Sequence, residues 1–219
     1  MPDKFKGIST KIADRCLGFV MKNRISKNID YNNVQYCNAT HVRDMFLSND
    51  KLLGHLDSNK RHINIGTGCG FMEYANTKYH SLNLKSVDLP RATVDPIYKI
   101  VQNKLNVKQD YDMKVMRKKD GSDLTIKNLD PFTDFQRWDN AIFVRFLPIK
   151  SDLTSLENIS KFNKNMKKYV DNITIVIVPT KGGYPNYKLF PNANIIDIKT
   201  NDGNSSVADG KIGIIEYDI

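Results

Sequence analysis

Apolar side chains recur at helical spacing over the first quarter of the chain. Two series fall near the period of an α-helix, with charged residues at many of the positions between them. The first series is Ile8, Ile12, Leu17 and Val20, and the second is Val42, Met45 and Phe46. We therefore expect two or three helices here, and we call residues 1–58 the N-terminal cap.

Short apolar runs alternate with helical patterns over residues 59–219. A run at 63–65 leads through a glycine-rich turn into a helical pattern, and this alternation then repeats. The expected strands are 63–65, 82–87, 140–146 and 173–178, and the expected helices are 71–80, 96–105 and 153–170. Strands that alternate with helices in this way predict an α/β fold with a mostly parallel sheet.

Two segments break the alternation. An Asp–Gly step at 120–121 lies between short β-prone pieces and predicts a hairpin turn. The last two apolar runs, at 194–199 and 211–217, are joined by a polar connection that is too short for a crossover helix. We expect these two strands to pair antiparallel and to close the sheet.

The composition is that of a single globular domain over residues 1–219. Hydrophobic residues make up 40% of the chain, and no repeat or linker marks a second domain. The cysteines, Cys16, Cys37 and Cys69, are an odd number without a CxxC pair, and the histidines lack paired spacing. We therefore expect neither a disulfide framework nor a bound metal. Because there is no signal sequence and no run of about 20 apolar residues, we expect a cytoplasmic protein (host cytoplasm if viral) with no membrane partner.

The charge balance is basic, with 33 Lys and Arg against 24 Asp and Glu and a formal net charge of +9. Such an excess attracts polyanions without sequence preference. Lys, Asn and Ile are abundant throughout, as in proteins from AT-rich genomes, and this bias explains the charge equally well. The net charge alone identifies no partner, whereas a clustered basic face beside the ligand site would favour RNA.

The candidate chemistry lies in the turn at 66–70, GTGCG, between the first core strand and its helix. Glycine permits positive φ and a close approach of ligand to backbone, and the helix N-terminus that follows offers unpaired N–H groups. Asp88 ends the next strand, where a carboxylate can accept hydrogen bonds from both hydroxyls of a ribose. The competing interpretation is a tight structural turn with a solvated loop aspartate.

Four segments resemble the class I S-adenosylmethionine-dependent methyltransferases in their order and approximate spacing. They are HINIGTGCGFMEYA, LKSVDLP, RWDNAIFVRFLP and NITIVIVP, and the resemblance covers residues 60–219. It implies a Rossmann-like, seven-stranded, mostly parallel sheet with the last strand antiparallel and helices on both faces. It also implies S-adenosyl-L-methionine as the cofactor.

The resemblance assigns roles at the turn. The glycines would cradle the methionine part of the cofactor, and Asp88 would hold its ribose. Asn64 stands where family members often carry an acidic residue that positions the methionine amine, and its amide accepts a hydrogen bond without supplying that charge. The expected cofactor-binding residues are Asn64, Gly66, Thr67, Gly68, Cys69, Gly70, Asp88 and Leu89.

Enzymes of this family usually bind substrate at the end of the fourth strand, which here contains Arg145 and Phe146. Arg145 can hold a carboxylate or phosphate through a bidentate contact, or equally form a structural salt bridge. The segment lacks the motif of amino-methylating DNA enzymes, and no cysteine has the Pro-Cys context of cytosine-C5 enzymes. Lys181 and Glu216 match part of the cap ribose methyltransferase set, and we interpret them as surface or supporting residues.

Two function classes stay open. The first is an enzyme that moves a methyl group to an oxygen or nitrogen of an acceptor, with a small molecule favoured and RNA possible. No catalytic residue is predicted, because the sulfonium methyl is already activated and positioning supplies most of the acceleration. The second is an inactive or weakly active cofactor-binding or protein-interaction scaffold with the same fold. We expect the N-terminal cap to cover the acceptor pocket as a lid, and the sequence predicts no oligomeric state.

Overall fold

The structure is a computed structural model. The residues that it describes are 4–23, 36–88, 96–107, 111–112, 114–117, 124–127, 137–144, 160, 163–164, 166–177, 194–197 and 211–219.

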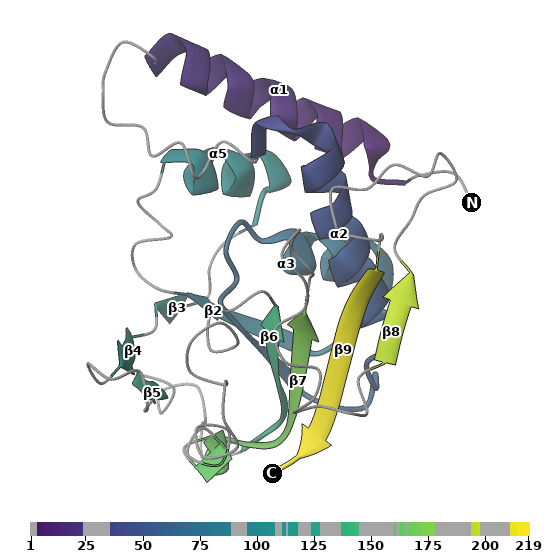
Figure 1. Cartoon of the computed structure of the whole chain (residues 1–219), viewed down its shortest axis with the longest axis vertical. Coiled ribbons are helices and arrows are strands. Elements are labelled where there is room, and N and C mark those ends of the chain that lie inside the picture. Colours follow the sequence, from purple (N-terminus) through teal and green to yellow (C-terminus); the bar gives the residue numbers. More distant parts are fainter. Residues whose placement is uncertain are drawn as a thin grey trace.

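The core is a 7-stranded sheet in the order β3-β2-β1-β6-β7-β9-β8 (Figure 1). Five neighbouring strands run parallel. They are β3 (Tyr111–Asp112), β2 (Leu84–Asp88), β1 (His62–Ile65), β6 (Trp138–Val144) and β7 (Val170–Ile177). Strand β9 (Lys211–Asp218) is antiparallel to both β7 and β8 (Asn194–Asp197). Strands β4 (Lys114–Arg117) and β5 (Leu124–Lys127) form a separate antiparallel pair across the predicted turn at 120–121. The predicted α/β fold with a mostly parallel sheet is confirmed.

The order in which the chain adds strands reverses at β1. Strands β2 and β3 extend the sheet on one side of β1, and β6 and β7 extend it on the other. Ligands in open α/β sheets bind beyond the carboxyl ends of the strands at such a switch point. The turn at 66–70 follows β1 directly and therefore lies at this position.

Helices α2 (Ala39–Leu53) and α3 (Phe71–Ala75) pack on one face of the sheet. Helix α2 begins at an N-cap, because the side-chain oxygen of Asn38 accepts hydrogen bonds from the backbone N–H groups of Thr40 (2.9 Å) and His41 (3.2 Å). One buried cluster joins these helices to β6 and β9 and includes Leu52, Leu53, Met72, Ile142, Ile212 and Ile214. The apolar stripe of α2 is therefore buried against the sheet.

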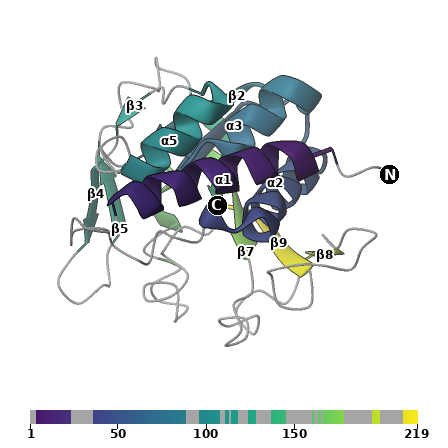
Figure 2. The same cartoon turned by 90° about the horizontal axis from the view of Figure 1, so that it is seen from above.

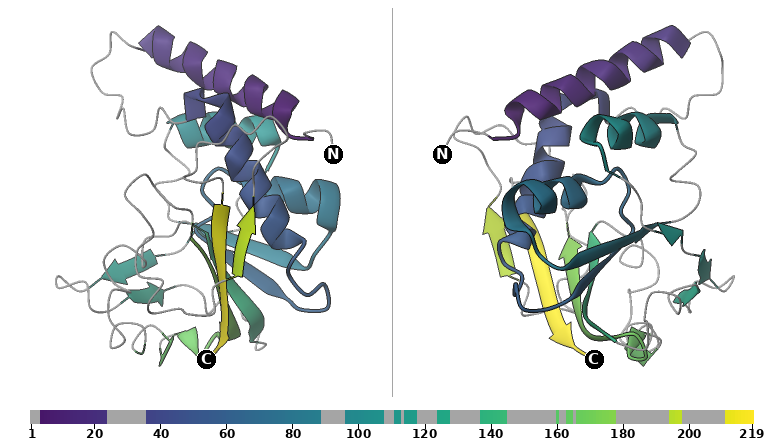
Figure 3. Two further views of the ribbon diagram at one scale, coloured as in Figure 1. Left: turned by 45° about the vertical axis from the view of Figure 1, so that its right-hand side comes forward. Right: turned by 180° about the vertical axis from the view of Figure 1, so that it is seen from behind.

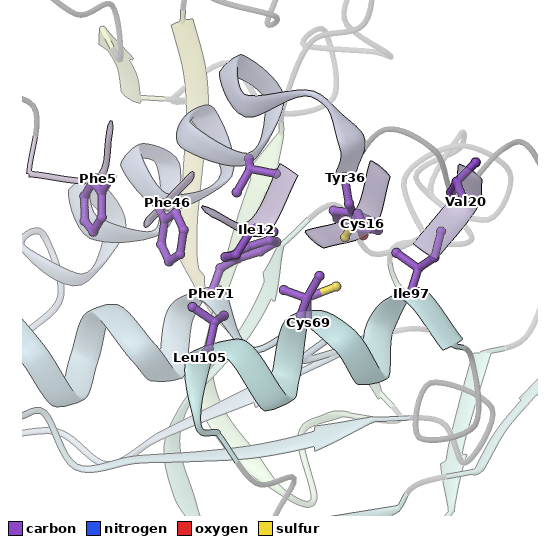
Figure 4. Packing of buried hydrophobic residues seen from close by; sticks show 12 residues of the cluster. Phe5, Ile12, Cys16, Val20, Tyr36, Phe46, Cys69, Phe71, Ile97 and Leu105 are labelled. Carbon is purple, nitrogen blue, oxygen red and sulfur yellow. The ribbon is translucent and has the colours of Figure 1, made fainter. Parts of the chain in front are cut away.

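Helix α1 (Lys6–Asn23) lies above α2 and beside α5 (Pro96–Leu105) (Figures 1 and 2). Its buried side includes Ile12, Cys16 and Val20, which belong to a second cluster shared with α2, α3 and α5 (Figure 4). The ring of Phe46 stacks on that of Phe5 with centroids 5.0 Å apart. The N-terminal cap is thus continuous with the hydrophobic core, and its action as a lid stays a prediction.

The helix expected over 71–80 is confirmed in extent, but its hydrogen-bonding pattern changes half-way. After Ala75 the chain continues as one π-helical turn, η2 (Asn76–His80). The side chain of Asn76 donates to the carbonyl of Leu82 (3.1 Å) and accepts from its N–H (2.8 Å). These bonds hold Leu82 in the connection, so β2 begins at Leu84 and not at 82 as predicted.

The described helices gather on one side and at one end of the sheet (Figure 3). The helix expected at 153–170 would form the crossover from β6 to β7, which the right-handed rule assigns to the opposite face. Its described residues Ser160, Asn163, Lys164 and Met166 are helical, whereas 153–159 lie outside the described residues. Within the described part of the chain, no helix is both long and apolar enough to cross a membrane.

The packing of aromatic rings around Phe46 predicts that two substitutions by alanine differ greatly in their effect on the free energy of unfolding. Phe46 is fully buried, so Phe46→Ala should lower the free energy of unfolding by about 3–5 kcal/mol through reduced burial and a cavity. Leu17 is 48% exposed on α1, so Leu17→Ala should change it by about 0.5 kcal/mol or less. Urea denaturation measures both, and equal effects would show that α1 does not pack as described.

Candidate functional site

The turn at 66–70 has the left-handed backbone that its glycines permit. The φ angles are 91° at Gly66, 59° at Gly68 and 83° at Gly70. The N–H groups of Gly66 (2.9 Å) and Thr67 (3.2 Å) donate to the carbonyl of Val87 in β2. The turn is therefore fixed to the carboxyl end of the neighbouring strand.

Asp88 closes this arrangement from the end of β2. Its carboxylate Oδ2 accepts a hydrogen bond from the backbone N–H of Gly68, so the structure brings together the glycine turn and the acid that the sequence singled out. The interpretation of Asp88 as a solvated loop residue is wrong, because its side chain is buried, with 7% of the residue exposed. Asp88 stabilises the turn whether or not a ligand is bound.

Helix α5 packs against the other side of the turn. The side-chain amide of Gln102 donates to the carbonyl of Gly68 (2.8 Å). A Cβ at Gly70 would overlap Cγ2 of Val107, whereas a Cβ at Gly68 would lie 3.6 Å from the ring of Tyr98. Glycine is thus required at 70 by the packing of the chain after α5, and at 68 chiefly by backbone conformation.

The side chain of Cys69 faces the helices. It is 2% exposed and belongs to the cluster formed with α1 and α5 (Figure 4). Tyr36 hydrogen-bonds to the side chains of Cys69 and Tyr98, and burial raises the pKa of the Tyr36 hydroxyl well above its usual value. Cys69 can offer a ligand its backbone, while its thiol is occupied in the core.

Sequence reasoning missed Glu73, which lies in the first turn of α3 beneath the glycine turn. Its Oε1 accepts hydrogen bonds from the amide of Asn64 (2.8 Å) and from the hydroxyl of Ser86. Burial raises the pKa of the Glu73 carboxyl above its ordinary value, although these hydrogen bonds oppose the change. The sequence alone could not show this contact, because Asn64 and Ser86 come into register on adjacent parallel strands only in the folded sheet.

Two acceptor atoms of this cluster have no partner among the described residues. They are Oδ1 of Asn64 and Oε2 of Glu73, and both are buried. A buried acceptor without a donor costs free energy, about 1–3 kcal/mol, and such an atom calls for an explanation. A ligand bearing N–H donors at the turn is one explanation that the chemistry of these atoms fits.

A second polar row crosses the same face of the sheet. The amide of Asn140 donates to Nδ1 of His62 (3.2 Å) and accepts from the hydroxyl of Thr174 (3.1 Å), and Nε2 of His62 donates to the carbonyl of Asp57 (2.9 Å). These bonds give both ring nitrogens of a buried histidine partners within the fold, which accounts for His62 as a structural residue. In the described ranges, no three His, Cys, Asp or Glu side chains are grouped to hold a metal ion.

The remaining predicted residues are either outside the described part of the chain or away from the turn. Leu89, Arg145, Phe146 and Lys181 lie outside the described residues. Glu216 is exposed on β9, where its carboxylate pairs with His55 (2.9 Å). The substrate end of the fourth strand thus stays a prediction.

Comparisons with solved structures find similar chains, several of which are described as methyltransferases. A putative O-methyltransferase from Nostoc punctiforme PCC 73102 shares 9% identity over 99% of this chain and 71% of its own, with a TM-score of 0.49. The 16S rRNA methylase ArmA shares 12% identity over 92% of this chain and 96% of its own, with a TM-score of 0.44. A cyclopropane-fatty-acyl-phospholipid synthase-like protein from Lactobacillus casei shares 12% identity over 63% of this chain, which spans half of that protein, with a TM-score of 0.37.

Other similar structures are complexes with S-adenosylmethionine and with S-adenosylhomocysteine. Neither a protein-family model nor a curated protein matches the chain. With identities of 12% or less and TM-scores below 0.5 in the structures named here, these likenesses leave the function to be inferred from the chain's own residues.

The close approach of Val107 to Gly70 predicts that a Gly→Ala substitution lowers the free energy of unfolding at Gly70, whereas the same substitution raises it at a glycine with open space around it. Gly70→Ala should lower the free energy of unfolding by about 2–4 kcal/mol, because the new methyl group meets Val107 and alanine is strained at positive φ. Gly18 lies within α1 with open space around its Cβ position, so Gly18→Ala should raise it by up to about 1 kcal/mol. Urea denaturation measures both, and the same sign at both positions would contradict this geometry of the turn.

The buried Glu73 carboxyl predicts a pH-dependent stability. Because its folded-state pKa is raised above 4.5, its contribution is full below that pH and is lost as the pH rises through the folded-state pKa. The free energy of unfolding of the wild type should therefore fall relative to Glu73→Gln above pH 4.5, by up to about 1.4 kcal/mol per pH unit. Urea denaturation across this range tests it, with Asp14→Asn on the exposed side of α1 as the control. Parallel profiles for wild type and Glu73→Gln would refute the assignment.

Proposed function

We propose that the protein binds S-adenosyl-L-methionine at the turn 66–70 and transfers its methyl group to an oxygen or nitrogen of an acceptor. The observation that carries the proposal is the hydrogen bond from Gly68 to Asp88. It joins a glycine turn after the first core strand to an acid at the end of the next, at the switch point of an open α/β sheet. This pairing of backbone cradle and carboxylate suits a nucleoside with a charged tail.

The residues present fit the proposed cofactor. Asp88 would accept hydrogen bonds from the ribose hydroxyls, and the glycine backbone would lie along the methionine part. The open acceptors Asn64 Oδ1 and Glu73 Oε2 have the chemistry to pair with the methionine ammonium, which is a donor only. Glu73 would supply the carboxyl that Asn64 lacks, from the helix and not from the strand.

The cofactor, when bound, would supply a methyl group already activated on a sulfonium. The chain's part would be to bind and orient, since holding the acceptor in line with the methyl group supplies most of the acceleration. The turn is held in place by hydrogen bonds to β2 and α5, and this fixed position would help to orient the methyl group toward the acceptor. Helices α1 and α5 would exclude water from the same end of the sheet.

A scaffold that binds the cofactor without turnover is the alternative, and one observation favours it. Asn64 carries no charge, and the raised pKa of Glu73 reduces the negative charge available to the ammonium. Binding together with no methyl transfer to any acceptor would decide for the scaffold. As an enzyme or as a scaffold, the chain is proposed to act as one domain in the cytoplasm.

The proposed role of Asp88 predicts a weaker affinity with the fold retained. Asp88→Asn keeps a carbonyl oxygen for the Gly68 N–H but removes the charge that strengthens hydrogen bonds from the ribose. Affinity for S-adenosylhomocysteine should fall about 10- to 100-fold, as expected for charge-assisted bonds worth about 1.5–3 kcal/mol. Isothermal titration calorimetry measures it.

The matched control is Asp57→Asn. Asp57 also accepts a hydrogen bond from a backbone N–H, that of Asn59 (2.9 Å). It lies in the turn before β1, however, at the amino-terminal end of the strand and not at the carboxyl end where the glycine turn lies. Its substitution should leave the affinity unchanged. Wild-type affinity in Asp88→Asn would refute the ribose contact, and no binding by the wild type would refute the proposed function.

A further inference from the structure

Helices α1 and α5 lie side by side (Figure 2), and their sequences are strongly basic. Their sequences contain six basic side chains and one acidic side chain, Asp14. All six basic residues are exposed, and they are Lys6, Lys11, Arg15, Lys22, Lys99 and Lys104. We call these six residues the basic face.

Within the described ranges, no acidic side chain forms an ion pair with the basic face. Some basic residues elsewhere are paired: Lys4 with Asp50 (2.7 Å), Arg61 with Asp139 (3.6 Å) and Arg137 with Asp171 (2.8 Å). A cluster of like charges is unfavourable unless a partner of opposite charge offsets it. The basic face is therefore suited to an anionic partner.

The basic face borders the proposed cofactor site. Helix α5 bonds to the turn through Gln102, and Cys69 of the turn is buried in the cluster that α1 and α5 share. A partner seated on these helices would lie at the same end of the sheet as the cofactor. Such a partner is placed to present an acceptor atom to the site.

An anionic membrane is the less suitable partner. Membrane-surface helices bury a broad apolar face in the lipid. The apolar side of α1 is instead buried in the protein through Ile12, Cys16 and Val20, and the large hydrophobic side chains exposed on α1 are Leu17 and Met21. Charge without a broad apolar face favours a hydrophilic polyanion.

We propose that the basic face binds the phosphate backbone of RNA and so delivers RNA as the methyl acceptor. This inference rests on the proposed function, which it deepens by naming the substrate class. RNA is favoured over DNA because the sequence lacks the motif of amino-methylating DNA enzymes and the Pro-Cys context of cytosine-C5 enzymes. On α1, Lys11 and Arg15 lie one helical turn apart and Lys22 two further turns on, so they line one side of the helix.

The test removes charge from the basic face and from a matched site. The variant carries Lys11→Gln, Arg15→Gln and Lys22→Gln, and the control carries Lys60→Gln, Lys85→Gln and Lys167→Gln. The control residues are also exposed. They lie in or just before β1, β2 and β7, near the amino-terminal ends of these strands, whereas the turn lies at the carboxyl ends. Fluorescence anisotropy with a labelled single-stranded RNA of about 20 nucleotides measures affinity at several salt concentrations.

The variant should bind the RNA at least about tenfold more weakly than the control. The slope of log affinity against log salt should become shallower by about 2, since each phosphate that a removed charge would have neutralised contributes about 0.7. Equal affinities for variant and control, or equal binding of duplex DNA and RNA by the wild type, would overturn the proposal. Binding to vesicles of phosphatidylcholine and phosphatidylserine, without binding to RNA, would identify a membrane partner instead.

The two proposals fail separately. Thermal stabilisation by S-adenosylhomocysteine reports the cofactor site and should be the same in the variant and the wild type, because the substituted side chains are exposed on α1. RNA binding without that stabilisation would refute the proposed function and keep the basic face as an RNA surface. Cofactor binding without RNA binding would refute the proposal that the basic face binds RNA, and a small molecule would then be the favoured acceptor.

Discussion

The hydrogen bond from the Gly68 N–H to the Asp88 carboxylate joins two segments that lie 20 residues apart. It requires a left-handed backbone at Gly68, a parallel β1–β2 pair in register, and a strand end that buries a carboxylate. Removing any of these would separate the turn from the acid. A buried charge is tolerated there because a backbone donor pairs with it. The geometry on which ligand binding would depend is therefore also part of what stabilises the fold.

The polar cluster below the turn adds a second constraint. Glu73 accepts from both Asn64 and Ser86, which ties α3 to the two strands it covers. Partly satisfied polar clusters are costly in a core, because each unpaired atom has given up its water. The open acceptors beside the turn, Asn64 Oδ1 and Glu73 Oε2, are thus a local cost to stability that a donor ligand would remove. Stability and recognition are coupled at this position.

Helices α1 and α5 serve two environments at once. Their inner sides complete the hydrophobic cluster that contains Cys69 of the turn, and their outer sides carry the basic face. Packing fixes the outer side relative to the turn, since neither helix can rotate without exposing its apolar stripe. The charge is consequently held in a defined position beside the site.

The sequence by itself determined the α/β class, the antiparallel closing strands and the importance of the segment 66–70, because hydrophobic periodicity and glycine spacing are local properties. It also paired the turn with Asp88. Only the tertiary structure decided that Asp88 is buried, that glycine at 70 is required by Val107, and that Glu73 supplies a carboxyl next to Asn64. Those facts depend on contacts between segments far apart in the chain. The net charge of +9 likewise does not show where basic residues cluster, and only the folded structure brings those of α1 and α5 together.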